Sequence, residues 1–297
     1  MAGASAVSAG GRPDDGRDKE ARFIMKQRMI TGAVLVALLI VLLYFGGAVM
    51  SITAMVCICF AVYEEYHALA LAGHRPVSWP TWVGMAISIP LTLIFGAGVI
   101  VPILIAVCMT TLVCVVFRDA PRLEDVLVSV MPLLTVVLPG MCIIALALVQ
   151  PKALQVVLLA MMFSIPVVGD TMAFFVGSRV GGPKLCPAVS PNKTISGAVA
   201  GLCGSLAAAL IIGGIGRAVC DEATRALLPS IPVCLLIGVI GGVAGQMGDL
   251  FASMVKRHCG IKDYSNLFPG HGGMLDRLDS ILFTAVVMFC YRLLVSM

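Results

Sequence analysis

The chain has 297 residues, of which 60% are hydrophobic and only 12% charged, and its mean hydropathy is +1.04. Soluble domains carry about 25% charged residues, so this composition excludes an ordinary soluble protein and indicates an all-α polytopic membrane protein. The net charge of +4 is modest, and we expect no nucleic-acid partner.

The first 28 residues are polar and lack the apolar core of a signal peptide. We expect residues 1–22 to form a disordered cytoplasmic tail, because they have little apolar surface to bury. Residues 23–297 are predicted to form one transmembrane catalytic domain, with helices over about 29–149 and a catalytic half over about 153–297. The eleven cysteines lie mostly in apolar runs and form no CxxC pair, so neither a disulfide framework nor a thiolate metal site is predicted.

Apolar runs alternate with polar loops along the rest of the chain, and a membrane-crossing helix needs about 20 apolar residues. Nine transmembrane helices are predicted, over about 29–45, 48–69, 79–94, 98–117, 125–149, 153–176, 195–216, 231–256 and 279–294. With a cytoplasmic N-terminus, sixteen Lys and Arg residues lie on the cytoplasmic side and three on the other, as the positive-inside rule requires. This orientation puts the two polar loops 178–194 and 256–277 together on the cytoplasmic side.

Charged residues become dense near the C-terminus, between residues 245 and 280. Asp249, Ser253 and Lys256 or Arg257 follow at helical spacings, so they share one helix face. A carboxylate and a hydroxyl suit a hard cation such as Mg²⁺, and the neighbouring basic group suits phosphate oxygens. Ionisable groups beside hydrocarbon are costly and therefore indicate a functional site.

A glycine-rich turn around His271 follows this helix. Its glycines leave backbone N–H groups free to meet an anion. Asp276, Arg277 and Asp279 come next, at the start of the last predicted helix, where the helix dipole favours carboxylates. Asp249 and Asp276 lie on helices joined by one loop, so they could converge on one Mg²⁺ ion or on two. Interfacial anchoring would explain the basic residues, but it explains the aspartates poorly.

A second polar group lies between the sixth and seventh predicted helices. Asp170 is near the end of the sixth helix, and the loop after it is rich in Gly, Pro, Ser and Lys and contains Lys193. Thr194 or Ser196 could cap the seventh helix, whose N-terminus would then face the cytoplasmic site and attract phosphate. The GxxxxGK[ST] spacing of a P-loop is absent.

These segments resemble the motifs of the bacterial CDP-diacylglycerol synthase family, also called phosphatidate cytidylyltransferase. The matching positions are Ser253, Lys256, Arg257, Lys262, Asp263, 268–273, 275–277 and Asp279, with Gly245, Gln246, 248–250, Asp170, Thr171, Ala173, Phe174, Ser190, Pro191, Lys193 and Thr194. Family members often carry Glu or Gln before the glycine that closes the S-P-x-K-T segment, where this chain has Ser196.

The resemblance implies a Mg²⁺-dependent, homodimeric enzyme of the cytoplasmic (inner) membrane that converts CTP and phosphatidic acid into CDP-diacylglycerol and pyrophosphate for phospholipid biosynthesis. Asp249 and Asp276 would hold the metal ion or ions, with Asp263 as a weaker candidate. Lys193 would bind a substrate phosphate beside the metal site, and His271 would orient a phosphate or the leaving group. The expected substrate-binding residues are Asp170, Ser190, Asn192, Lys193, Ser253, Lys256, Arg257 and Arg277.

Two other functions fit the same residues. One is a CTP-dependent kinase of prenyl alcohols or other lipids, or a cytidylyltransferase for another lipid phosphate. The other is a transporter of an anionic solute, which would use broken helices and repeat its polar residues in both halves, whereas here they concentrate in the C-terminal half. Outside the motifs, Glu64 and Glu65 either lie at the membrane interface or support the site.

Overall fold

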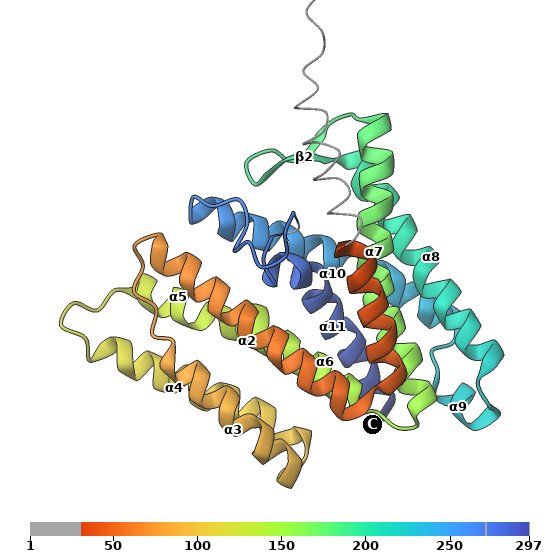
Figure 1. Ribbon diagram of the computed structural model, residues 1–297, viewed down its shortest axis with the longest axis horizontal. Helices are drawn as coiled ribbons and strands as arrows, with labels where there is room; N and C mark the ends of the chain where they lie inside the picture. Colours follow the sequence, from red (N-terminus) through yellow and green to blue (C-terminus); the bar gives the residue numbers. More distant parts are fainter. Residues whose placement is uncertain (1–30, 271, 297) are drawn as a thin grey trace, which may run out of the picture.

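The computed structural model describes residues 31–270 and 272–296, and helices make up most of this part of the chain (Figure 1). The elements in order are a helix at Thr31–Phe45, α2 (Gly47–Leu71), α3 (Trp79–Phe95), the 3-10 turn η1 (Ala97–Val99), α4 (Ile100–Val116), α5 (Leu123–Pro132), the π-helical segment η2 (Leu133–Val137), α6 (Leu138–Ala147), α7 (Lys152–Val180), β1 (Lys184–Cys186), β2 (Ser190–Thr194), α8 (Ile195–Val219), α9 (Glu222–Leu227), α10 (Ile231–His258) and α11 (Leu275–Ser296). The predicted tail over 1–22 lies outside the described residues.

Six helical stretches in the described part of the chain are long and apolar enough to cross a membrane. They are Gly47–Leu71, Leu123–Ala147, Lys152–Val180, Ile195–Val219, Ile231–His258 and Leu275–Val295. This confirms the all-α membrane fold. Shorter helices occupy the other three predicted segments, so the total of nine spans stays a prediction, and so does the orientation.

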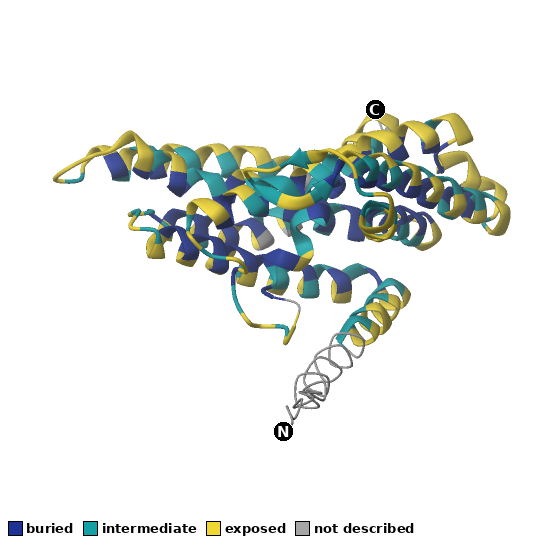
Figure 2. Cartoon of the chain, turned by 90° about the horizontal axis from the view of Figure 1, so that it is seen from above, coloured by how far each residue is buried: buried dark blue, intermediate teal, exposed yellow. Residues whose placement is uncertain are grey.

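The outer faces of the helices carry large exposed apolar side chains, as lipid-facing surfaces do. Ile52 is 66% exposed and Ile94 is 70% exposed. Seen from above, exposed residues cover the outer faces of the helices and buried residues lie between them (Figure 2). The many apolar residues that first indicated a membrane protein therefore lie both in the interior between the helices and on their outer faces.

The fifth predicted span contains a π-helical segment. Pro132 precedes η2 and Pro139 follows it, and each proline lacks the N–H group that an α-helix would use. The widened turn keeps α5, η2 and α6 as one rod of membrane length over Leu123–Ala147. Thr135 in η2 donates its hydroxyl to the Glu65 carboxylate of α2, at 3.0 and 3.2 Å.

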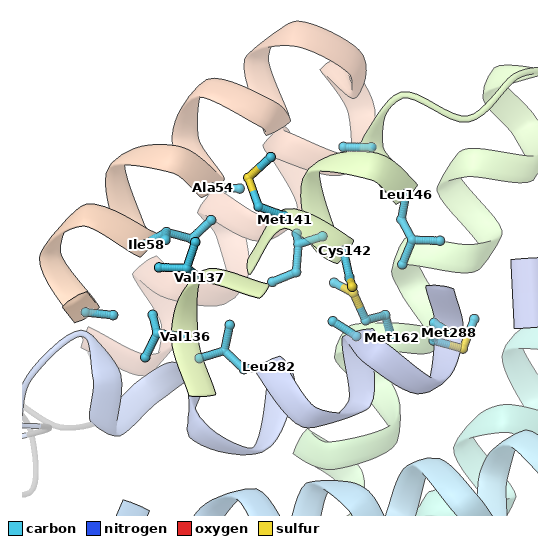
Figure 3. Close-up of a cluster of buried hydrophobic side chains, with 14 of the residues drawn as sticks. Ala54, Ile58, Val136, Val137, Met141, Cys142, Leu146, Met162, Leu282 and Met288 are labelled. Carbon is cyan, nitrogen blue, oxygen red and sulfur yellow. The ribbon is translucent and has the colours of Figure 1, made fainter. Parts of the chain in front are cut away.

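The main apolar core lies where α6 packs between α2 and α11. Ile58 from α2, Val136 and Met141 from the η2–α6 rod, and Leu282 from α11 are all buried there (Figure 3). Met162 brings α7 into the same cluster. This core joins the first helices of the chain to the last one.

Glycine, rather than large side chains, forms the contact between α7 and α8. A Cβ atom on Gly197 would lie 2.8 Å from the carbonyl oxygen of Ala173, and one on Gly177 would lie 2.9 Å from the Thr194 hydroxyl. Small residues allow two membrane helices to approach closely. The start of α8 is therefore held against the half of α7 that carries Asp170.

Two predicted boundaries are corrected. The segment predicted at 279–294 is wrong at its start, because α11 begins at Leu275, where carboxylates accept its first N–H groups. The loop predicted at 178–194 contains an antiparallel hairpin in which Lys184 pairs with Thr194 and Cys186 with Ser190. The second strand of the hairpin, β2, leads directly into α8, so the hairpin fixes the direction in which the chain enters this helix.

Candidate active site

A polar cavity of about 400 Å³ lies between α7, the hairpin, α10 and α11. Its lining residues are Asp170, Ala173, Phe174, Ser178, Leu185, Lys193, Thr194, Gly197, Ala198, Gln246, Asp249, Lys256, Asp263, Asp276, Arg277, Asp279 and Ser280. Five carboxylates and three basic side chains are among them. The two polar groups that the sequence analysis singled out thus meet in one cavity.

The first ion pair of the cavity joins Lys193 of β2 to Asp249 of α10. Thr194, the next residue, caps α8 by accepting the N–H group of Gly197 at 3.1 Å. This confirms Thr194 as a capping residue and fixes the strand that presents Lys193. Ser253, one turn after Asp249, donates to its second oxygen at 3.4 Å, so the predicted shared helix face is confirmed.

The second ion pair joins Lys256 of α10 to Asp276 of α11, with 2.6 Å between Nζ and Oδ1. These residues are only 9% and 8% exposed. The other oxygen of Asp276 accepts the backbone N–H groups of Tyr264 at 2.8 Å and Gly273 at 2.9 Å. Lys256 also lies 5.6 Å from the centre of the Tyr264 ring, a distance at which a cation is attracted to an aromatic face.

Tyr264 is also buried beside the second ion pair. Burial, with Glu65 and Asp276 nearby, raises its pKa above the ordinary value for tyrosine. The hydroxyl therefore stays neutral, and it donates to the Ala252 carbonyl at 3.4 Å. Tyr264 thus ties the loop after α10 back onto α10 beside Lys256.

Two further carboxylates share one hydroxyl in the cavity. Ser280 Oγ lies 3.3 Å from Asp170 Oδ2 and 3.3 Å from Asp279 Oδ1. Asp170 was predicted as a site residue, and Asp279 was singled out as a motif carboxylate without a site role, whereas Ser280 was not named. Asp279 follows Asp276 by three residues and so lies on a neighbouring turn of α11.

The donor set of this cavity fits Mg²⁺ as a group of hard oxygen ligands. Asp249, Asp276 and Asp263 all line it, although Asp249 and Asp276 each face a lysine. Within residues 31–270 and 272–296, no three His, Cys, Asp or Glu side chains form a ready metal cage. Mg²⁺ is usually held by one or two carboxylates, with water and substrate phosphates as its other ligands.

Some predicted site residues do not line the cavity. Ser190 and Asn192 lie on β2 outside it, and Asn192 is exposed. The Arg257 guanidinium donates to the Ile261 carbonyl at 3.3 Å, so Lys256 rather than Arg257 is the basic residue that α10 presents. His271 lies outside the described residues.

Ser196, the departure from the family pattern, has a defined partner in the hairpin segment. Its hydroxyl donates to the Gly181 carbonyl and lies 3.1 Å from the Thr194 hydroxyl. It does not line the cavity. Ser196 therefore ties both ends of the hairpin segment together at the start of α8.

The structure also places Gln246, which was only a matching motif position, and Glu64, one of the two glutamates whose placement the sequence analysis left open. Gln246 of α10 donates to the Ala198 carbonyl of α8 at 3.0 Å and lines the cavity. Glu64 is buried behind the loop before α11. No sequence signal links Glu64 to that loop, because about two hundred residues separate them.

Comparisons with known proteins give consistent results. The model of the "Cytidylyltransferase family" matches residues 26–295. The "Phosphatidate cytidylyltransferase" of Bacillus subtilis (strain 168) is 44% identical over 125 residues, which cover 42% of this chain and 42% of that protein. The proteins of the same name from Brucella abortus biovar 1 (strain 9-941) and Staphylococcus saprophyticus are 38% identical over 122 residues and 42% identical over 114. These cover 41% and 38% of this chain, and 42% and 40% of those proteins, so each match spans less than half of the relative.

Proposed function

This chain belongs to the cytidylyltransferase family, and from that premise we propose that it is a phosphatidate cytidylyltransferase. It joins CTP and phosphatidic acid to give CDP-diacylglycerol and pyrophosphate. One observation carries the proposal: two lysine–aspartate ion pairs, Lys193 with Asp249 and Lys256 with Asp276, line one cavity. That arrangement supplies both basic groups for phosphates and carboxylates for a cation.

The reaction needs positioning and charge neutralisation more than covalent help from the protein. An oxygen of the phosphatidate phosphate attacks the α-phosphorus of CTP and forms a new P–O bond. The bond between the α-phosphorus and the bridging oxygen breaks, and its electron pair leaves with pyrophosphate. A phosphomonoester already carries negative charge near neutral pH, so no general base is required. Lys193, Lys256 and Arg277 neutralise the phosphates of the two substrates.

Mg²⁺ supplies further neutralisation of the triphosphate when it is bound. Asp249 and Asp276 would hold it, and the weaker candidate Asp263 lines the same cavity. Lys193 and Lys256 are the ion-pair partners of Asp249 and Asp276. The phosphate oxygens of CTP would offer both lysines alternative partners, and the two carboxylates would then be available to hold the cation.

The membrane setting is part of the proposal. The chain would span the cytoplasmic membrane nine times as a homodimer, with its N-terminus and the cavity on the cytoplasmic side, where CTP is found. Six described helices of membrane-crossing length and the distribution of Lys and Arg support this. The acyl chains of the lipid would stay in the bilayer and reach the cavity between helices.

The test uses the purified full-length protein in lipid nanodiscs, with labelled CTP, phosphatidic acid and Mg²⁺. We expect equal amounts of pyrophosphate and of a lipid that carries CMP. In a parallel reaction with a prenyl alcohol in place of phosphatidic acid, release of CDP with a phosphorylated lipid would instead identify a CTP-dependent kinase, and an absence of CTP turnover in both reactions would contradict both functions. If Asp249→Asn and Asp276→Asn kept normal activity and Mg²⁺ dependence, the metal assignment would be wrong.

A further inference from the structure

Glu64 of α2 is a buried carboxylate outside the cavity, and its partners belong to the segment that leads into α11. It is 4% exposed. Its Oε1 accepts the Ser265 hydroxyl at 2.6 Å and the Met274 N–H at 2.9 Å, and its Oε2 accepts the Leu275 N–H at 2.8 Å. Both oxygens are therefore committed to one loop and one helix start.

These contacts cap α11 from a distant part of the chain. The first N–H groups of a helix have no partner within the helix, and the helix dipole favours a negative charge beside them. Leu275 is the first residue of α11, and Met274 directly precedes it. Glu64 therefore does for α11 what a local capping residue does for other helices.

The loop before α11 is also held by Asp276, which lies on the opposite side of the loop from Glu64. Gly273 donates its N–H group to Asp276 at 2.9 Å, whereas a Cβ atom on Gly273 would lie 2.6 Å from both Glu64 oxygens. The backbone at Gly273 is thus enclosed between two carboxylates, one inside the cavity and one behind it. A shift of Glu64 would move the residues that set the position of Asp276.

We propose that Glu64 is a positioning residue, which fixes the start of α11 so that Asp276 and Arg277 face the cavity. The kinetic part of this inference rests on the proposed function. Glu65 provides a matched comparison, because it is the next residue and is 1% exposed. Its carboxylate accepts the Thr135 hydroxyl and, among the described residues, no backbone N–H group of the loop.

The first test compares Glu64→Gln with Glu65→Gln by hydrogen–deuterium exchange of the full-length protein. The new glutamine amide turns an NH₂ group toward a backbone N–H donor, so one cap is lost without a change in size. We expect amide exchange over residues 265–277 to rise at least about tenfold in Glu64→Gln, since these amides lose a charge-assisted acceptor. Exchange elsewhere and the melting temperature should match Glu65→Gln.

The second test is steady-state turnover of the same variants. We expect kcat of Glu64→Gln to fall by about 10- to 100-fold with little change in KM for CTP, as a misplaced reacting group causes. Glu64→Asp, which keeps the charge, should recover part of the loss, and it serves as the test variant if Glu64→Gln does not fold. Gly273→Ala should raise exchange over the same residues, because its methyl group displaces Glu64 from the other side.

Unchanged exchange over 265–277, a uniform rise along the chain, or a kcat loss equal to that of Glu65→Gln would each overturn the inference. The two proposals fail separately. If the wild-type protein forms no CDP-lipid, the proposed function fails, and the exchange pattern still decides whether Glu64 holds the start of α11.

Discussion

The two halves of the molecule are packed in different ways. Helices α2 to α6 meet through large apolar side chains such as Ile58 and Met141. Helices α7 and α8 meet through glycines, and near the cavity the backbone of one helix lies against the backbone of the other. In helices α2 to α6 the large side chains fill the interior. In α7 and α8 the close glycine contacts set the distances between Asp170, Lys193 and Asp249.

This difference has a physical consequence for substitution. Packed side chains can shift or change rotamer when a neighbour loses a methyl group, and the cost is then moderate. A helix backbone has no such freedom, so a new side chain must push the helices apart. New side chains at the glycine contacts of the second half should therefore reduce activity, and changes to the apolar packing of the first half, where Glu64 is not involved, should mainly reduce stability. Four substitutions test this contrast, beginning with the largest expected effect.

Asp249→Asn should have the largest effect, a loss of about 10²–10³-fold in activity, the range seen when one electrostatic group of a reaction site is removed. The amide keeps the size of the side chain but removes the charge that pairs with Lys193. Turnover of labelled CTP measures the loss. Asp221→Asn is the control, because Asp221 caps α9 away from the cavity. Equal activity in the two variants would contradict the role of the first ion pair.

Lys256→Gln should cost about 10²-fold in activity and also stability, since it leaves the buried Asp276 carboxylate without its cation. Arg257→Gln is the matched variant, one residue along the same helix. Arg257 is exposed and donates to the Ile261 carbonyl rather than to a carboxylate of the cavity, so we expect less than about a threefold change. A larger loss in Arg257→Gln would show that the other basic residue of α10 serves the substrate.

Gly197→Val should destabilise the protein by about 1–3 kcal/mol through overpacking and lower the activity of the molecules that remain folded. The new side chain would begin 2.8 Å from the Ala173 carbonyl oxygen. Thermal unfolding in detergent measures the change. Gly214→Val, on the same helix with nothing within 4 Å of its Cβ position, should change stability by less than about 0.5 kcal/mol. Similar losses in both variants would contradict the close contact of α7 and α8.

Ile58→Val should have the smallest effect, a loss of about 0.5–1.5 kcal/mol in stability. Ile58 is 1% exposed, and its side chain covers Gly140 of α6. We expect the turnover of the folded protein to be unchanged. A fall in turnover without a fall in melting temperature would show that the apolar packing of the first half, and not only Glu64, sets distances in the site.

The sequence allowed much of the fold to be predicted, because hydrophobic length and turn residues are local signals. The six spans that meet the length requirement all coincide with predicted segments. The start of α11 was missed, since its cap comes from Glu64 and not from a neighbouring residue. The hairpin was also missed, because strands of only three and five residues are too short to give a clear alternating pattern.

The site was predictable where residues lie on one helix or in one motif. Asp249 and Ser253 follow from helical spacing, and Thr194 follows from its position before α8. The pairing of Lys193 with Asp249 depends on the contact of three helices, which spacing alone does not specify. For the same reason the choice between Lys256 and Arg257 required the structure.

The contact between Glu64 and the last loop also has a consequence for biosynthesis. Glu64 and Ser265 are 201 residues apart, which corresponds to roughly 10–40 s of translation at about 5–20 residues per second. The second helix therefore leaves the ribosome with a carboxylate whose hydrogen-bond donors have not yet been synthesised. A chain that stops before residue 274 never provides the backbone amides that Glu64 requires, so these hydrogen bonds form only after Leu275 has been synthesised.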